Sequence, residues 1–230
     1  MRVLVLGNGK LGSEIIKQSN WDSLCRKNNK INVSNFDDWA YKLIPYDVIV
    51  NCIANTNTYS NSKEDHWDAN YKFVSYLVDF CNEYGKKLIH ISTDYVYVNS
   101  IENAKETDVP VHDGNWYSYT KLLADSYIEL KSKDYLICRL SHKDNPFIYD
   151  SAWVDVKTNA DYTDVISSLV IQLINLDSKG LYNVGTEVKT IYDLAKQTKD
   201  VNPIDSPINI PKNVTMDISK LTKTISKKTL

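Results

Sequence analysis

Three of the chain's seven glycines stand together directly after its first apolar segment. Residues 2–6 predict a short buried strand, and Gly7, Gly9 and Gly12 form a Gly-x-Gly-x-x-Gly turn that leads into an amphipathic stretch. In a dinucleotide-binding unit the first glycine allows the tight turn, the second lets the backbone approach a pyrophosphate, and the third lets the helix pack on the strand. The turn therefore predicts an α/β fold that binds a nucleotide at its start, and a structural turn without a ligand is the weaker alternative.

The composition is that of an ordinary globular protein. Of 230 residues, 43% are hydrophobic and 24% are charged, which allows one large α/β domain and a small second lobe. The net charge of -2 gives no reason to expect nucleic acid or a membrane as a partner. The four cysteines lie far apart without paired spacing, which argues against a disulfide framework and against a metal site. We find neither a signal peptide nor the roughly 20 apolar residues of a membrane span, so the predicted location is the cytoplasm.

Hydrophobic periodicity divides the rest of the chain into alternating strands and helices. Further strands are expected at residues 23–26, 47–54, 87–91, 135–139 and 181–184. Helices are expected at residues 36–44 with Asn35 as the cap, at 63–84, around Tyr117, at 161–174 and at 190–197, followed by an extended or turn-like end. The alternation predicts a doubly wound, mostly parallel sheet of the Rossmann, NAD(P)-binding kind with a small C-terminal substrate lobe. The predicted core is 1–140 with 160–184 returning to it, and the predicted lobe is 141–159 and 185–230.

Two cations favour NADPH over NADH as the cofactor. An NAD-binding unit carries an acidic residue about 20 positions beyond the glycines, where it binds the ribose 2′-hydroxyl. Arg26 and Lys27 occupy that neighbourhood instead, and both suit a 2′-phosphate. An exposed charged loop is an equally weighted alternative, so NADH stays open as a cofactor.

Four tyrosine–lysine pairs have the four-residue spacing that places both side chains on one face of a helix. They are Tyr59/Lys63, Tyr117/Lys121, Tyr127/Lys131 and Tyr192/Lys196. Only Tyr117 and Lys121 begin a helix that follows, by a single loop, a central strand closed by Thr93. We expect the Lys121 ammonium to lower the pKa of the Tyr117 phenol, which then exchanges a proton with a carbonyl or alcohol oxygen that Thr93 also hydrogen-bonds.

Two histidines receive simpler interpretations. His66 has no second histidine or cysteine at metal-ligand spacing, so we expect a surface residue. His90 lies inside an apolar strand, so we expect a core histidine whose hydrogen bonds are satisfied.

Together these motifs resemble the extended short-chain dehydrogenase/reductase superfamily, and more narrowly the dTDP-4-dehydrorhamnose reductase family. The resemblance rests on the glycine turn, on the Ser92-Thr-Asp-Tyr-Val-Tyr97 segment and on Tyr117-x-x-x-Lys121. Further matches spread it over nearly the whole chain, at Val50–Ala54, Asn70, Gly180–Gly185 and Met216–Lys220.

The resemblance implies that Thr93, Tyr117 and Lys121 are catalytic and that a nucleotide-sugar 4-keto group is reduced with NADPH or NADH. Candidate cofactor contacts, besides Tyr117 and Lys121, are Gly7, Gly9, Lys10, Leu11, Gly12, Arg26, Lys27, Asn32, Val33, Cys52, Ile53, Ala54 and Asn70. Candidate substrate contacts are Thr56, Thr58, Asp94 and Tyr95, and no metal is expected. Many relatives look dimeric, which leaves a homodimer open.

Departures from the family pattern keep alternatives open. Tyr95 stands where the related 4,6-dehydratases carry glutamate, which disfavours dehydration. The region after the fifth strand is shorter than in the family, and residues 139–143 stand where the family shows an Arg-Thr-Ser-Trp-Val-Tyr-like segment. A helix that normally follows is missing before Asp161. An epimerase that works by transient oxidation, or a non-catalytic NADP(H)-binding regulatory subunit, are the two other interpretations.

Overall fold

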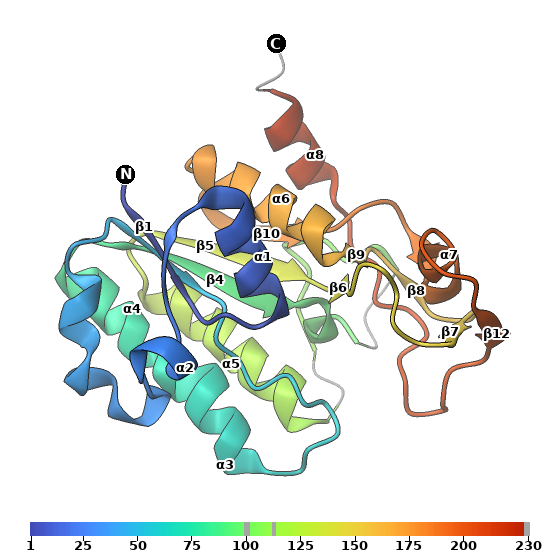
Figure 1. Cartoon of the computed structure of the whole chain (residues 1–230), viewed down its shortest axis with the longest axis horizontal. Helices are drawn as coiled ribbons and strands as arrows, with labels where there is room; N and C mark the ends of the chain where they lie inside the picture. The colour runs from blue at the N-terminus through green and yellow to red at the C-terminus, as the bar shows by residue number, and fades with distance from the viewer. Residues whose placement is uncertain (99–101, 112–113, 228–230) are drawn as a thin grey trace.

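A six-stranded, wholly parallel sheet organises the chain (Figure 1). The computed structural model describes residues 1–98, 102–111 and 114–227. The strands run in the order β10-β5-β4-β3-β1-β2, with bounds β1 Val3–Leu6, β2 Asp22–Leu24, β3 Val48–Asn51, β4 Lys87–Thr93, β5 Tyr135–Leu140 and β10 Gly180–Val184. The strand order reverses at β1, so the carboxyl ends of β1 and β3 flank the place where doubly wound sheets bind ligands. The predicted doubly wound fold is confirmed.

Helices cover both faces of the sheet (Figure 1). On one face lie α1 (Lys10–Ser19), α6 (Thr163–Asn175) and α8 (Ser219–Ser226), and on the other α4 (Phe73–Glu83) and α5 (Trp116–Lys131). In β1, Val3 and Val5 join the apolar cluster under α1 and α6, whereas Leu4 and Leu6 join the cluster under α4 and α5. A strand that is buried on both faces has no polar side, which explains its continuous apolar sequence.

The prediction of a single helix over residues 36–44 is wrong. Two short 3-10 helices stand there, η1 (Val33–Asp38) and η2 (Ala40–Leu43). Asn32 caps the first of them by accepting a backbone N–H at 3.1 Å, whereas Asn35 lies inside it with φ -122° and ψ 51°. Asparagine side chains compete for backbone donors, and this favours caps and turns over regular helix.

The second strand ends two residues earlier than predicted. Cys25 has the extended backbone of an N-cap, and its Sγ accepts from Asn28 N at 3.5 Å. The cap begins the short helix α2 (Arg26–Asn29), so Arg26 belongs to this helix and not to the strand.

The helix predicted over residues 63–84 is continuous but changes its winding. It consists of α3 (Lys63–His66), a six-residue π segment η3 (Trp67–Lys72) and α4. His66, predicted at the surface, is 0% exposed, so that prediction is wrong. A π turn closes hydrogen bonds to the fifth residue instead of the fourth and so changes which side chains face the neighbouring elements. Here η3 packs against α5.

The C-terminal lobe is built from strands of two or three residues. They pair as β7 (Ser151–Trp153) with β12 (Asn202–Ile204), β8 (Lys157–Thr158) with β11 (Lys189–Thr190), and β6 (His142–Lys143) with β9 (Asp161–Tyr162). Helix α7 (Ile191–Ala195) starts at the predicted cap, Thr190, through a capping box. The end of the chain is not wholly extended, because α8 forms there and buries Leu221 in the cluster under α6.

Candidate active site

The turn after β1 has the geometry that its three glycines predict. Gly7 has φ +91°, in the left-handed region that favours glycine. A Cβ atom on Gly12 would lie 2.2 Å from Gly7 O, so α1 can pack on the turn only with a glycine there. At Gly9, the N-cap of α1, a Cβ atom would meet nothing within 4 Å, which leaves room in front of the helix. The turn therefore fits a pyrophosphate at the positive end of α1.

The cations predicted to bind a 2′-phosphate lie one strand away from the glycine turn. Gly7 N donates to Leu24 O at 2.8 Å and so ties the turn to the end of β2. Arg26 and Lys27 follow as exposed residues of α2. On the other side of the turn, Lys10 Nζ forms an ion pair with Asp144 at 2.6 Å. Arg26 and Lys27 thus remain at the solvent edge of the predicted cofactor site.

Thr93 and Tyr117 meet at the carboxyl end of β4. Thr93 is 3% exposed, and its Oγ1 accepts from Tyr95 N at 3.2 Å to start the 3-10 turn η4 (Asp94–Val96). Tyr117 lies in the first turn of α5, which Asn115 caps by accepting a backbone N–H at 2.8 Å. Burial raises the pKa of Tyr117 to about 12, against the smaller lowering effect of a hydrogen bond with Thr93. The phenol is therefore protonated at neutral pH.

Lys121 is held by β4. Its Nζ lies 2.9 Å from His90 Nε2 and donates to Ile91 O at 2.6 Å. Burial lowers the pKa of Lys121 to about 8, and Asp125 acts in the opposite direction. Nearby carboxylates, and not Lys121, are the charges that shift the pKa of Tyr117, and they raise it. The prediction that Lys121 lowers the pKa of Tyr117 is therefore wrong for this arrangement of the lysine.

Asn70 joins the loop after β3 to α5. Its Oδ1 accepts from Asn55 N at 2.8 Å, and its Nδ2 donates to Asn55 O at 3.0 Å and to Thr120 Oγ1 at 3.1 Å. The same Nδ2 lies 3.3 Å from His66 Nδ1. The His66 ring lies edge-on to the Tyr117 ring with centroids 6.4 Å apart, and His66 Nε2 has no hydrogen-bond partner among the described residues. Asn70 thus fixes the position of this loop beside the predicted catalytic tyrosine.

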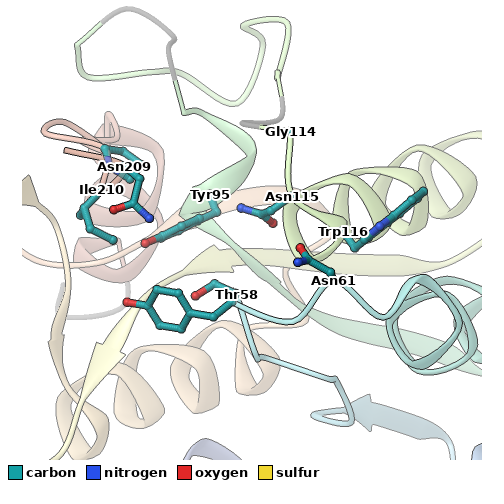
Figure 2. A pocket seen from close by; sticks show the side chains of 10 residues that line it. Thr58, Asn61, Tyr95, Gly114, Asn115, Trp116, Asn209 and Ile210 are labelled. Carbon is teal, nitrogen blue, oxygen red and sulfur yellow. The ribbon is translucent and has the colours of Figure 1, made fainter. Parts of the chain in front are cut away.

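A cavity of about 280 Å³ opens beside η4 and the start of α5 (Figure 2). The loop after β3, the η4–α5 region and the lobe each supply part of its wall: Thr58, Tyr59, Asn61, Tyr95, Gly114, Asn115, Trp116, Asn209, Ile210 and Pro211. In Figure 2, Thr58 and Asn61 lie on one side of the cavity, with Tyr95 and Asn115 across from them. The Tyr95 ring also meets the Tyr117 ring at 6.2 Å between centroids, which links the cavity to the predicted catalytic tyrosine.

Two of the four predicted substrate contacts do not line this cavity. Thr56 is exposed on the loop after β3. Asp94 is 2% exposed and accepts from Thr93 Oγ1 at 3.3 Å. Burial raises the pKa of Asp94 to about 7, and Lys143 acts in the opposite direction.

Sequence reasoning missed several residues at the site. His90, expected to be only a core residue, contacts the predicted catalytic lysine, and its place two residues from the Ser92–Thr93 strand end was a usable signal. Asn209 and Ile210 reach the cavity from the lobe, and no motif marks them. The loop between β4 and α5 lies partly outside the described residues.

The described part of the chain offers neither a metal site nor a membrane-spanning helix. No three or more His, Cys, Asp or Glu side chains come together in a way that could hold a metal ion. None of the described helices has the length and apolar character needed to cross a membrane.

The parallel sheet, with a glycine turn where its strand order reverses, defines a dinucleotide-binding type of α/β fold. More narrowly, the chain belongs to the family of the RmlD substrate binding domain, which matches residues 1–148. The resemblance read from the sequence is therefore confirmed at the level of the family.

Solved structures share the fold over nearly the whole chain. A hypothetical dTDP-4-dehydrorhamnose reductase from Sulfolobus tokodaii superposes with a TM-score of 0.81 at 22% identity, covering 97% of this chain and 94% of that one. The Bacillus anthracis dTDP-4-dehydrorhamnose reductase in complex with NADP has a TM-score of 0.81 at 20% identity, covering 96% and 91%. A UDP-glucuronic acid 4-epimerase from Bacillus cereus, with NAD, has a TM-score of 0.80 at 19% identity, covering 98% and 93%. At these identities the likeness establishes the fold.

One curated relative matches at the level of sequence. The spore coat polysaccharide biosynthesis protein SpsK of Bacillus subtilis is 27% identical over 155 residues, which are 61% of this chain and 52% of that protein. The match thus spans about half the length of the curated relative.

Proposed function

We propose that this protein reduces the 4-keto group of a nucleotide-linked deoxy sugar with NADPH or NADH. The observation that carries the proposal is the position of Tyr117 in the first turn of α5, where its ring centroid lies 6.2 Å from that of Tyr95 in the cavity wall. Reduction of a ketone needs a proton donor at the carbonyl oxygen, and a tyrosine phenol can give that proton. Thr93 Oγ1 would hydrogen-bond the same oxygen and fix its position.

The chain has the parts that a dinucleotide needs. Gly7, Gly9 and Gly12 would hold the pyrophosphate at α1, and Arg26 and Lys27 favour a 2′-phosphate at the edge of the site. A bound nicotinamide would supply the hydride. Among the relatives, one reductase structure contains NADP, whereas other neighbours contain NAD, so either cofactor agrees with the fold.

The cavity supports a sugar as the substrate. Thr58, Asn61 and Asn209 offer hydroxyl and amide groups, which both donate and accept hydrogen bonds, as sugar hydroxyls require. Tyr95 and Trp116 add aromatic surface on which the apolar face of a ring can lie. We therefore propose that the lobe, through residues 209–211, contributes to the choice of sugar.

The test of the proposal is NADPH oxidation against a panel of nucleotide-linked 4-keto sugars. A reductase consumes the cofactor in equal amounts with the substrate. Conversion of a sugar without net consumption of NADPH would indicate an epimerase instead. Binding of NADPH with no reaction of any sugar would indicate a regulatory subunit.

The Tyr117→Phe variant tests the assignment of the proton donor. We expect it to lower turnover by about 10³-fold, because the general acid is removed, and to leave NADPH affinity within about twofold of the wild type. Tyr127→Phe is the matched control, since it removes a phenol from the same helix away from β4, and turnover should stay near the wild-type value. Equal activity in the two variants would show that Tyr117 is not the acid.

A further inference from the structure

One backbone donor fixes the orientation of the Asn51 side chain at the end of β3. Ile53 N donates to Asn51 Oδ1 at 3.0 Å. A backbone N–H can only donate, so the amide oxygen must face it and the amide nitrogen must face the other way. That nitrogen, Nδ2, lies 3.3 Å from His90 Nδ1, and both side chains are buried, at 1% and 0% exposure.

The fixed amide in turn determines the tautomer of His90. Because Asn51 Nδ2 is a donor, His90 Nδ1 must accept, and the ring proton must be on Nε2. Burial holds the pKa of His90 well below its usual value, which keeps the ring neutral. The Nε2–H group then points at Lys121 Nζ, 2.9 Å away.

Lys121 can accept that hydrogen bond only as an amine. An ammonium has three donors and no lone pair, so it would place N–H against N–H at His90 Nε2. The neutral amine accepts there with its lone pair and donates to Ile91 O, 2.6 Å away. The other tautomer of His90 would not help, because it would place Nδ1–H against the Nδ2–H of Asn51.

The other groups around Lys121 agree with this assignment. Asp125 is one helical turn away but makes no hydrogen bond with Lys121, and its Oδ2 accepts from Arg139 Nε and Ser92 Oγ, both at 2.9 Å. Burial raises the pKa of Cys52 to about 12, so this neighbour is an uncharged thiol. Lys121 therefore has no anion in hydrogen-bond contact that would require it to be charged.

We propose that Asn51 and His90 are positioning residues, which at pH 9 hold Lys121 as a neutral amine turned toward β4 until a cofactor binds. To reach a ribose hydroxyl, Lys121 leaves His90 and takes up one proton from solvent. The proton uptake rests on the proposed function, whereas the tautomer of His90 and the neutral amine stand on the contacts of this structure alone.

The direct test is the tautomer of His90, measured by long-range 1H–15N correlation on 15N-histidine-labelled protein at pH 9. The chain has four histidines, and the His90→Gln variant assigns the signal. We expect the Nε2–H form in the wild type. An Nδ1–H form would overturn the proposal, and this measurement needs no enzymatic activity.

The Asn51→Asp variant tests the chain of hydrogen bonds. A carboxylate accepts from both Ile53 N and His90 Nδ1–H, so the ring should change to the Nδ1–H tautomer and the pKa of Lys121 should rise by about one unit or more. Lysine side-chain NMR, assigned with Lys121→Met, measures that pKa.

Asn70→Asp is the matched control, because Asn70 makes the same contact with His66 without a lysine beyond it. The variant should change the tautomer of His66 and leave Lys121 as it was, and an unchanged His90 in Asn51→Asp would contradict the proposal.

Calorimetry tests the coupling to the cofactor. NADPH binding at pH 9, measured in buffers of different ionisation enthalpy, should take up close to one proton per site, and clearly less in Asn51→Asp. Uptake near zero in the wild type would overturn the coupling. Failure of NADPH to bind at all would count against the proposed function, and the histidine tautomer would still decide on the role of Asn51 and His90.

Discussion

Two ion pairs, one in the parallel sheet half and one in the C-terminal lobe, lie in opposite surroundings. In the sheet half, Arg139 Nε meets Asp125 Oδ2 at 2.9 Å with side chains that are 2% and 0% exposed. In the lobe, Lys199 Nζ meets Asp150 Oδ1 at 2.7 Å, but the carboxylate is 94% exposed. The first pair connects α5 to β5 inside the core, whereas the second is a solvated contact between loops. The same chemistry therefore serves as a structural connection in the buried pair and contributes little to stability in the exposed pair.

The largest expected effect comes from breaking the buried pair. Asp125→Ala leaves Arg139 as a buried charge without its carboxylate, and we expect a loss of about 3–5 kcal/mol in the free energy of unfolding. Asp150→Ala, its counterpart in the lobe, should leave the unfolding midpoint near the wild-type value. Urea titration of both variants measures the difference. Similar losses in the free energy of unfolding would show that the exposed pair of the lobe stabilises the protein as much as the buried pair of the sheet half.

The second prediction compares one glycine in each region. A Cβ atom on Gly12 would lie 2.2 Å from Gly7 O, and one on Gly185, directly after β10, would lie 2.6 Å from Asn159 O. Both Gly12→Ala and Gly185→Ala should therefore destabilise the protein, by about 1–3 kcal/mol each. Gly9→Ala meets nothing within 4 Å and is the control. An unchanged free energy of unfolding in Gly185→Ala would show that the lobe can shift to make room for a Cβ atom, whereas the sheet half cannot.

The third prediction concerns the junction between the two regions. Burial lowers the pKa of His142, on β6, to about 4, and Lys143 adds to the effect. Between that value and the unfolded pKa of about 6.5 only the unfolded chain binds the proton, so stability falls as the pH falls through this range. His142 alone should remove about 2 kcal/mol by pH 5 and nothing above pH 7. Unfolding titrations should give a flatter profile for His142→Gln, although His90 adds its own slope to both proteins. Identical slopes of stability against pH in the two proteins would show that His142 does not cause the loss of stability at low pH.

The smallest expected effect lies at the exposed edge of the sheet half. Arg26→Ala should weaken NADPH binding by about tenfold, or about 1.4 kcal/mol, and change NADH binding by less than twofold. Lys17→Ala removes a cation from the far end of α1 and should change neither affinity. Fluorescence titration with the two cofactors gives both values. Equal losses of NADPH and NADH affinity in Arg26→Ala would show that Arg26 does not contact a 2′-phosphate.

The comparison also explains what the sequence could predict. The sheet strands are apolar runs between turn residues, so local pattern alone located β1, β3, β4, β5 and β10 within one to three residues at each end. Tyr117 and Lys121 could be chosen because a parallel sheet brings strand ends and helix starts to one edge. In these cases the local sequence pattern and the tertiary fold favour the same structure.

The misses share a different cause. Local pattern says nothing of His66, which the π turn and its contact with α5 bury. It says nothing of Asn209, which reaches the cavity from far along the chain. It also gave the wrong direction for the pKa shift of Tyr117, because helical spacing does not reveal that Lys121 contacts His90 on β4. Each of these depends on a contact between distant residues, and a single sequence does not report such contacts.

The π segment from Trp67 to Lys72 makes the number of residues per turn a property of the site. Each residue of an α-helix advances the chain by roughly 100° around the axis, whereas a turn closed to the fifth residue takes up one residue more. If this segment closed as a regular α-helix with all its residues kept, Lys63–His66 would rotate by about that angle relative to α4. The His66 ring would then leave the edge of Tyr117 although every side chain at the site was still present. In protein engineering, the residues that hold the π turn therefore need the same protection as the residues that line the site.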